Sequence, residues 1–115
     1  INYALVEDTI YLHCAPEGRK LRAISADERV SFCVVGHSRV VSEHFTTEFE
    51  SVIAHGRARV VESDDERRMA LRAIVEKYSA EHIEEGLKAI ERSIHRTAII
   101  AIAVDSFSGK IKKGL

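Results

Sequence analysis

The first fourteen residues alternate apolar and polar side chains with a period of two. Two apolar runs, "YALV" and "TIYLHC", are separated by the acidic pair Glu7 and Asp8. A period of two is typical of a strand with one buried face, and a short polar break between two such runs is typical of a hairpin. The pattern therefore predicts strands near residues 2–6 and 9–14, joined by a tight turn.

A proline and a glycine follow the second strand. Pro16 cannot donate a hydrogen bond to a neighbouring strand, and Gly18 tolerates unusual backbone angles. We therefore expect the second strand to end by Ala15. The stretch "GRKLRAISADE" that follows predicts a short helix with Leu21 and Ile24 facing inward.

Two further strands are predicted in the middle of the chain. The run "RVSFCVVG" places alternate apolar residues on one face, and we expect Gly36 to end it. Residues 37–50 have no clear period, and no element is assigned to them. Residues 51–62, "SVIAHGRARVVE", are rich in β-branched side chains and predict a long strand, in which Gly56 marks a bulge or a close backbone approach.

A helical segment follows this strand. Ser63 with Glu66 three residues later has the form of a capping box, and Asp64 and Asp65 suit the positive end of a helix dipole. These residues predict a helix that begins after Ser63 and runs to about Tyr78.

A second helix is predicted from near Ala80, because apolar residues recur at steps of four, three and four. They form one stripe: Ile83, Leu87, Ile90 and Ile94. The stretch "RTAIIAIAVDSF" then predicts a strand buried on both faces for much of its length, and "SGKIKKGL" predicts a polar tail. Strands thus surround a helical insertion, so the fold class is α+β in one domain spanning residues 1–115.

Charge and cysteine content limit the classes of function. With 17 Lys and Arg against 18 Asp and Glu, the formal charge of -1 favours neither nucleic acid nor an anionic membrane as a partner, so any anion site must be local. No apolar run approaches the ~20 residues that a membrane span needs. Cys14 and Cys33 lie in apolar runs, which suits reduced thiols in the cytoplasm, and we expect Cys33 in the core.

Metal and hydrolase chemistry are not predicted. His13 and Cys14 are neighbours on a strand and should point to opposite faces, and the chain has no C-x-x-C pair, so no metal site is expected. A serine hydrolase would need an elbow such as G-x-S-x-G, and the context of Ser51 does not match it.

The start of the first helix is the candidate for anion chemistry. Arg19 and Lys20 fall in its first turn, where unpaired backbone N–H groups and the helix dipole already favour negative charge. Arginine can hold two phosphate oxygens and lysine adds a compact charge. The alternative is that both cations merely face solvent, and the residues alone leave it open.

Three stretches of the chain resemble one family. "YLHCAPEGRKL" resembles the phosphate-binding segment of the pyridoxamine 5'-phosphate oxidase-like proteins with an FMN-binding split β-barrel, above all the nitroimidazole-resistance subgroup. Their pattern His-x-Ala-x-x-Gly-x-Lys is met by His13, Ala15, Gly18 and Lys20. "FESVIAHGRARVVESDDERRMAL" and "RTAIIAIAVDSFSGK" resemble later strands of the same subgroup. The resemblance covers most of the chain in the right order.

The resemblance implies a fold and an assembly. The fold would be an antiparallel, six-stranded, Greek-key-like split barrel with a helical insertion before the last strand. Family members usually begin with a helix and two strands that precede the first hairpin seen here, and we expect such a leading segment to be absent from this copy. The implied cofactor is FMN, bound at the interface of a homodimer, and the implied partner is a small-molecule electron acceptor.

The resemblance also implies roles for individual residues. Arg19 and Lys20 match the positions that hold the FMN phosphate, and Gly18 lets the backbone approach it. His13 and Cys14 match the strand positions beside the ribityl chain and the ring edge.

The remaining assignments concern the cleft and the chemistry. Ser51 and Val52 fall where a later strand lines the flavin cleft. His13 is the candidate catalytic residue, because an imidazole can donate a hydrogen bond to reduced flavin or to the acceptor. The implied function is a small flavin-dependent oxidoreductase. A non-catalytic flavin-binding or sensing module is the alternative, and an interaction domain without flavin is a third.

Overall fold

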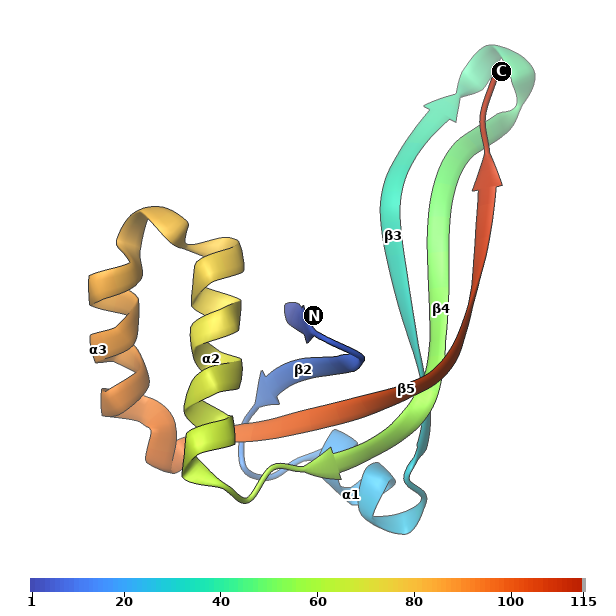
Figure 1. Ribbon diagram of the computed structural model, residues 1–115. Helices are drawn as coiled ribbons and strands as arrows, with labels where there is room; N and C mark the ends of the chain where they lie inside the picture. The colour runs from blue at the N-terminus through green and yellow to red at the C-terminus, as the bar shows by residue number, and fades with distance from the viewer. Residues whose placement is uncertain (115) are drawn as a thin grey trace.

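The computed structural model describes residues 1–114, whose strands form one antiparallel sheet in the order β1-β2-β5-β4-β3 (Figure 1). The strands are β1 (Tyr3–Val6), β2 (Thr9–Cys14), β3 (Arg29–Val41), β4 (Thr46–Val60) and β5 (Ala98–Lys112). The predicted first hairpin is confirmed. Within these residues there are five strands, and the sixth that the resemblance implies is not among them.

Three helices complete the fold and confirm the α+β class. α1 (Arg19–Ala26) follows β2, whereas α2 (Asp64–Tyr78) and α3 (Ile83–Ser93) form the insertion between β4 and β5. Short 3-10 turns cover Ser42–His44, Ala80–His82 and Ile94–Arg96. α2 and α3 lie side by side at one end of the sheet, and α1 lies at its foot (Figure 1). No helix in the described part of the chain is long and apolar enough to cross a membrane.

The first part of β5, residues 99–102, is buried on both faces, as its sequence predicts, whereas most of the strand beyond it is exposed. Ile99 and Ala101 face α2 and α3, and Ile100 and Ile102 face α1 and β3, so the strand separates two apolar clusters. The first cluster contains Tyr11, Val61, Ala70, Leu71, Ile90, Ile99 and Ala101. The second contains Ile10, Leu12, Ala54, Ala58, Ile100 and Ile102, with Leu21 and Ile24 of α1 packed against it.

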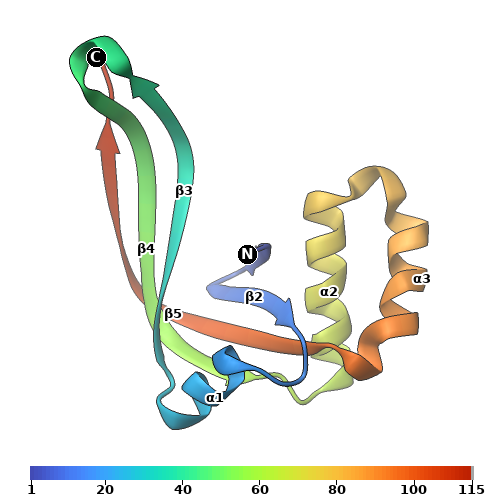
Figure 2. The same cartoon turned by 180° about the vertical axis from the view of Figure 1, so that it is seen from behind.

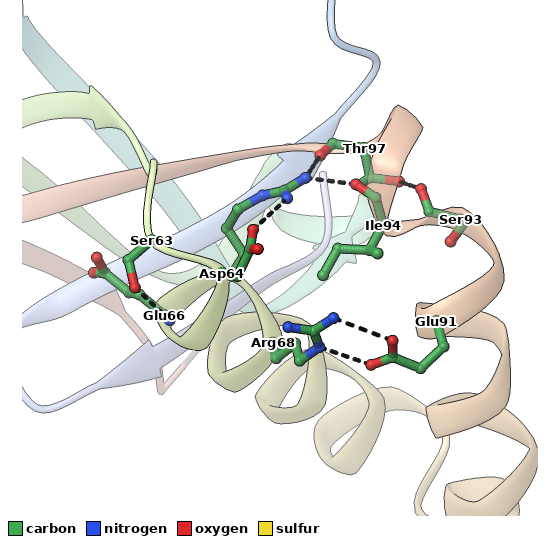
Figure 3. Close-up of polar contacts among 9 residues, drawn as sticks. Ser63, Asp64, Glu66, Arg68, Glu91, Ser93, Ile94 and Thr97 are labelled. Carbon is green, nitrogen blue, oxygen red and sulfur yellow. Dashed lines mark hydrogen bonds and ion pairs between the residues drawn. The ribbon is translucent and has the colours of Figure 1, made fainter.

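Polar contacts hold the two helices of the insertion together (Figure 3). The Ser63 hydroxyl accepts a hydrogen bond from the Glu66 N–H at 3.3 Å, which confirms the predicted N-cap of α2. Arg68 forms an ion pair with Glu91 at 2.8 Å, and Arg67 donates to two backbone carbonyls in the turn after α3. α2 is therefore bonded both to α3 and to the turn that leads from α3 into β5.

β3, β4 and the second half of β5 form an arm that projects away from the helices (Figures 1 and 2). The radius of gyration is 16.6 Å, whereas a globular domain of this length has about 13 Å. Large apolar side chains on the arm are exposed, among them Val40 (74%), Phe45 (97%) and Phe107 (75%). Several exposed apolar side chains on one part of a molecule are typical of interaction surfaces.

Two strand boundaries differ from the predicted ones: the end of β3, and the start of β4, which begins at Thr46 and not at residue 51. Gly36 does not end β3, which continues to Val41 through a register shift between Val35 and His37. Residues 37–50, which have no clear period, form the tip of the arm. A glycine at a bulge and a glycine at a strand end look the same in the local sequence. Only the pairing with the neighbouring strand distinguishes the two cases.

The predicted polar tail is also wrong. Residues 108–112 belong to β5 and pair with residues 49–53 of β4, and the Lys112 ammonium donates to the Thr46 hydroxyl at 2.7 Å. Leu115 lies outside the described residues. Cys33, expected in the core, is exposed because strand alternation places it on the opposite face of β3 from Phe32, which packs against the second cluster.

Candidate functional site

The corner between β2 and α1 places backbone N–H groups and two cations together. Gly18 precedes the helix with φ 152°, a conformation that side chains rarely adopt, and the Arg22 N–H donates to its carbonyl at 3.2 Å. No side chain caps α1, and its first turn contains no acidic residue. The N–H groups of that turn therefore keep their capacity to bind an anion.

Arg19 and Lys20 carry the positive charge of this corner. Both are exposed, and among residues 1–114 neither side chain takes part in an ion pair or a hydrogen bond. The first turn of α2 contrasts with this one, because it carries Asp64, Asp65 and Glu66. Burial raises the pKa of the Cys14 thiol, and the nearby Lys20 charge partly opposes that rise.

Two hollows meet at Lys20. The smaller, about 160 Å³, is the corner hollow, lined by Cys14, Ala15, Glu17, Gly18, Arg19, Lys20 and Leu21. Glu17 supplies one negative charge against the two cations, so the hollow keeps a net positive charge. The larger, about 300 Å³, is lined by apolar residues that include Leu12, Ile24 and Phe32. A ligand held at Lys20 can therefore place an anionic group in one hollow and an apolar group toward the other.

Ser51 and Val52 line a separate hollow of about 450 Å³ on the arm, which we call the arm hollow. Gly36 of β3 and Gly109 of β5 line it too, so part of its surface is bare backbone. A flat ring can lie against such a surface because no Cβ atom projects from it. The arm hollow shares no lining residue with the corner hollow.

His13 lies away from these hollows. Strand alternation places it on the same face of β2 as Tyr11, toward the helices, whereas Cys14 packs with the cluster beside α1. It is exposed and pairs with Ile99 of β5. The structure thus brings Cys14, Gly18, Arg19 and Lys20 together and leaves His13 apart from them, so its catalytic role stays a prediction.

Sequence reasoning missed the other residues of the arm hollow. Gly36, Glu50, Gly109 and Ile111 line it, and they come together only because β4 pairs with β3 on one side and with β5 on the other. Gly36 and Gly109 are the features of the sequence that could have indicated this hollow. No group of three or more metal-ligating side chains occurs in the described part of the chain.

Comparison with known proteins identifies one family. The family model described as pyridoxamine 5'-phosphate oxidase matches residues 1–111. The chain belongs to the pyridoxamine 5'-phosphate oxidase family. The match extends over nearly the whole chain, and the family resemblance of the three sequence stretches is confirmed. No curated protein matches the chain.

Solved structures agree on the fold of this pyridoxamine 5'-phosphate oxidase family member. A protein of Bacteroides thetaiotaomicron provisionally assigned to 5-nitroimidazole antibiotic resistance is 23% identical, with a TM-score of 0.70 over 94% of this chain and 64% of its own. A conserved hypothetical protein of Mycobacterium tuberculosis is 17% identical, with a TM-score of 0.76 over 95% of this chain and 64% of its own.

A third structure, the FAD and heme binding protein of Mycobacterium smegmatis, is 20% identical, with a TM-score of 0.75 over 97% of this chain and 57% of its own. The chain therefore spans less than two thirds of the length of each of these three proteins.

Proposed function

We propose that the protein binds FMN, with the 5'-phosphate in the corner hollow. The observation that carries the proposal is the pair Arg19 and Lys20, two cations without an anionic partner in the first turn of a helix that has no acidic residue there. Gly18 lets the backbone approach the phosphate, and Cys14 lines the same hollow beside the ribityl chain. A phosphate dianion would satisfy the N–H groups and both charges at once.

The structural relatives favour a flavin over other phosphate ligands. The relative from M. smegmatis is described as binding FAD and heme, and one from Mesorhizobium loti as binding FAD. Another, from Azotobacter vinelandii, is a flavocytochrome. FMN is the flavin we propose here because the segment with Gly18, Arg19 and Lys20, which lines the corner hollow, resembles a segment that binds the FMN phosphate. The free thiols Cys14 and Cys33 support the cytoplasm as its location.

We further propose a homodimer in which the corner hollow of one subunit faces the arm hollow of the other. The phosphate would bind at Lys20 of one subunit, and Ser51 and Val52 of its partner would line the cleft beside the flavin ring. Two observations support this arrangement. The two hollows share no residue within one chain, and the arm exposes Val35, Phe107 and Ile111, which a second subunit would bury.

Sedimentation velocity tests the assembly, and a dimer is the expected result with or without FMN. Phe107→Asp should shift the equilibrium toward monomer, because it places a charge on the exposed apolar surface of the arm. Met69→Asp is the matched control, since Met69 is a 38% exposed apolar residue on α2, away from the arm. A wild-type protein that sediments only as a monomer when FMN is bound would contradict the proposed dimer.

The proposed reaction is electron transfer from reduced flavin to a small acceptor such as a nitro compound. Bound flavin supplies the hydride or the electrons. The protein positions the flavin by its phosphate, and His13 would donate a hydrogen bond near the ring or to the acceptor. A binding or sensing module without turnover is the second candidate, favoured by the position of His13 away from both hollows.

A reoxidation experiment separates the enzyme from the binding module. The protein is purified and its visible absorption recorded, and the FMN form is then reduced anaerobically and mixed with a nitroimidazole. Rapid return of the oxidised flavin spectrum, slowed in His13→Ala while FMN stays bound, is the expected result. Oxidation of pyridoxamine 5'-phosphate by the oxidised form would instead indicate the oxidase reaction. Inertness toward every acceptor would leave the binding module.

A further inference from the structure

A polar hollow lies on the sheet where β3, β4 and β5 run side by side, apart from the corner and arm hollows. It has a volume of about 430 Å³, and six of its lining residues are polar: Arg29, Ser31, His55, Arg57, Asp105 and Ser106. We call it the arginine hollow. Of these residues, only Ser31 also lines a hollow at Lys20, the larger apolar one, and none lines the corner hollow or the arm hollow.

A bulge in β5 gives this hollow its shape. His55 pairs with Ser106 and Gly56 pairs with Val104, so Asp105 has no partner of its own in β4. Gly56 permits the bulge, because a Cβ atom there would lie 2.2 Å from the Ala103 carbonyl oxygen. The bulge places the Asp105 carboxylate 3.9 Å from the Arg57 guanidinium. Bulges commonly redirect side chains beside functional sites.

Two arginines oppose each other across the strands. Arg29 is directly opposite Arg57 in the β3–β4 pairing, and like charges in that relation are unfavourable unless an anion lies near both. The Arg29 guanidinium donates two hydrogen bonds to the Asp27 carboxylate, at 2.7 and 3.1 Å. These bonds lower the pKa of Asp27 to about 2. Arg29 is thereby held in one orientation with its remaining N–H groups available.

Arg57 is held much less firmly than Arg29. Its contact with Asp105 at 3.9 Å is too long for a hydrogen bond, and both side chains are about two thirds exposed, at 67% and 63%. Within residues 1–114 the Arg57 guanidinium makes no hydrogen bond, so its donors are free for an anion. Ser31 Oγ and His55 Nδ1 lie 3.1 Å apart, which leaves His55 Nε2 as a further polar atom facing outward.

We propose that the arginine hollow binds an oxyanion of the phosphate class between Arg57 and Arg29. The anion accepts hydrogen bonds from the free N–H groups of both guanidinium groups, and Ser31 and His55 border it. Asp105 competes with the ligand for Arg57 and Asp27 orients Arg29. This site is independent of the proposed FMN phosphate site, because none of its residues lines the corner hollow or the arm hollow.

A titration of the full chain with inorganic phosphate, followed by amide NMR at constant ionic strength, tests the proposal. We expect saturable shifts at Arg29, His55 and Asp105. Arg57→Gln should weaken binding about tenfold, the loss expected for one charged hydrogen-bonded contact. Arg72→Gln is the matched control, since Arg72 is similarly exposed (58%) and paired with Glu76 on α2. Its affinity for phosphate should be unchanged.

Asp105→Asn provides the sharper test, because it removes the competing carboxylate and should strengthen phosphate binding several-fold. A purely structural role for the Arg57–Asp105 pair would give the opposite result or none. A second titration uses acetate in place of phosphate, because a site for carboxylates in general would bind both anions. Equal shifts with chloride alone would mean an adventitious ion only and would overturn the proposal, as would an Arg57→Gln variant with unchanged affinity.

The same titration separates this proposal from the FMN site. Shifts at Gly18, Arg19 and Lys20 report the corner hollow, and shifts at Arg29, His55 and Asp105 report the arginine hollow. Phosphate that shifts only the second set supports the arginine hollow and counts against the FMN phosphate site. Phosphate that shifts only the first set overturns the inference drawn here and leaves the proposed FMN site intact.

Discussion

Gly56→Ala is expected to lower the free energy of unfolding by about 3 kcal/mol or more, the range in which overpacking and backbone displacement combine. The new Cβ atom would lie 2.2 Å from the Ala103 carbonyl oxygen and 3.0 Å from its carbon. These are backbone atoms of the paired strand, so no side-chain rotation relieves the overlap. β4 and β5 must separate locally, and β5 carries the apolar residues of both clusters.

Urea unfolding measures this effect, and Gly109→Ala is the matched control. Gly109 lies in the same β4–β5 pairing, but a Cβ atom there would meet only the Ser51 carbonyl oxygen at an ordinary 3.6 Å. Its substitution should change the free energy of unfolding by less than about 1 kcal/mol. Equal unfolding midpoints for the two variants would show that the bulge at Gly56 tolerates a side chain.

The two glycines Gly36 and Gly56 illustrate what a sequence pattern can and cannot predict. Gly56 interrupts a long run of β-branched residues, so a bulge or a close backbone approach within one strand was predicted. Both occur there, because the register shifts at Gly56 and a Cβ atom at Gly56 would lie 2.2 Å from the Ala103 carbonyl oxygen. Gly36 follows an equally good run but is succeeded by polar residues, so the same signal suggested a strand end. The strand continues because β4 pairs along its whole length, and that pairing is a long-range property.

The end of the chain shows a similar limit. Three lysines in "KIKK" favour a solvated tail by composition, yet Lys112 and Lys113 find partners across the arm in Thr46 and Glu50. The helices were easier to predict, because capping at Ser63 and a stripe through Ile90 are local signals. For the site, the glycine and two cations of the corner are contiguous in sequence and were predictable.

The arm hollow is not contiguous in sequence. Its lining comes from residues 34–36, 50–52 and 109–111, which only the strand register brings together. Ser51 and Val52 were therefore predicted only through the family resemblance, and their glycine neighbours were not predicted at all. Residues that are adjacent in the sequence therefore identify the phosphate end of the proposed flavin site. The ring end can be identified only from the pairing of the strands.

Lys20→Ala is expected to weaken FMN binding by about 1 to 3 kcal/mol, or roughly 5- to 150-fold, if Lys20 contacts the phosphate as a charged donor. Lys20 lines both hollows, and its side chain forms no ion pair with a carboxylate in the described chain. Binding should also weaken as salt rises, because exposed charges are screened. Equilibrium dialysis of FMN with the full-length protein measures both effects.

Two controls decide whether the loss belongs to the phosphate. Riboflavin lacks that group, so it should bind wild-type protein much more weakly than FMN, and its affinity should be nearly the same for wild type and Lys20→Ala. Arg22→Ala removes an equal charge from the same helix but from outside the corner hollow, so FMN binding should change little. Equal losses for FMN and riboflavin in Lys20→Ala would mean that the substitution disturbs the fold of the corner. Equal losses in Lys20→Ala and Arg22→Ala would mean that only the general positive charge of α1 matters, and the phosphate would then have to be placed elsewhere.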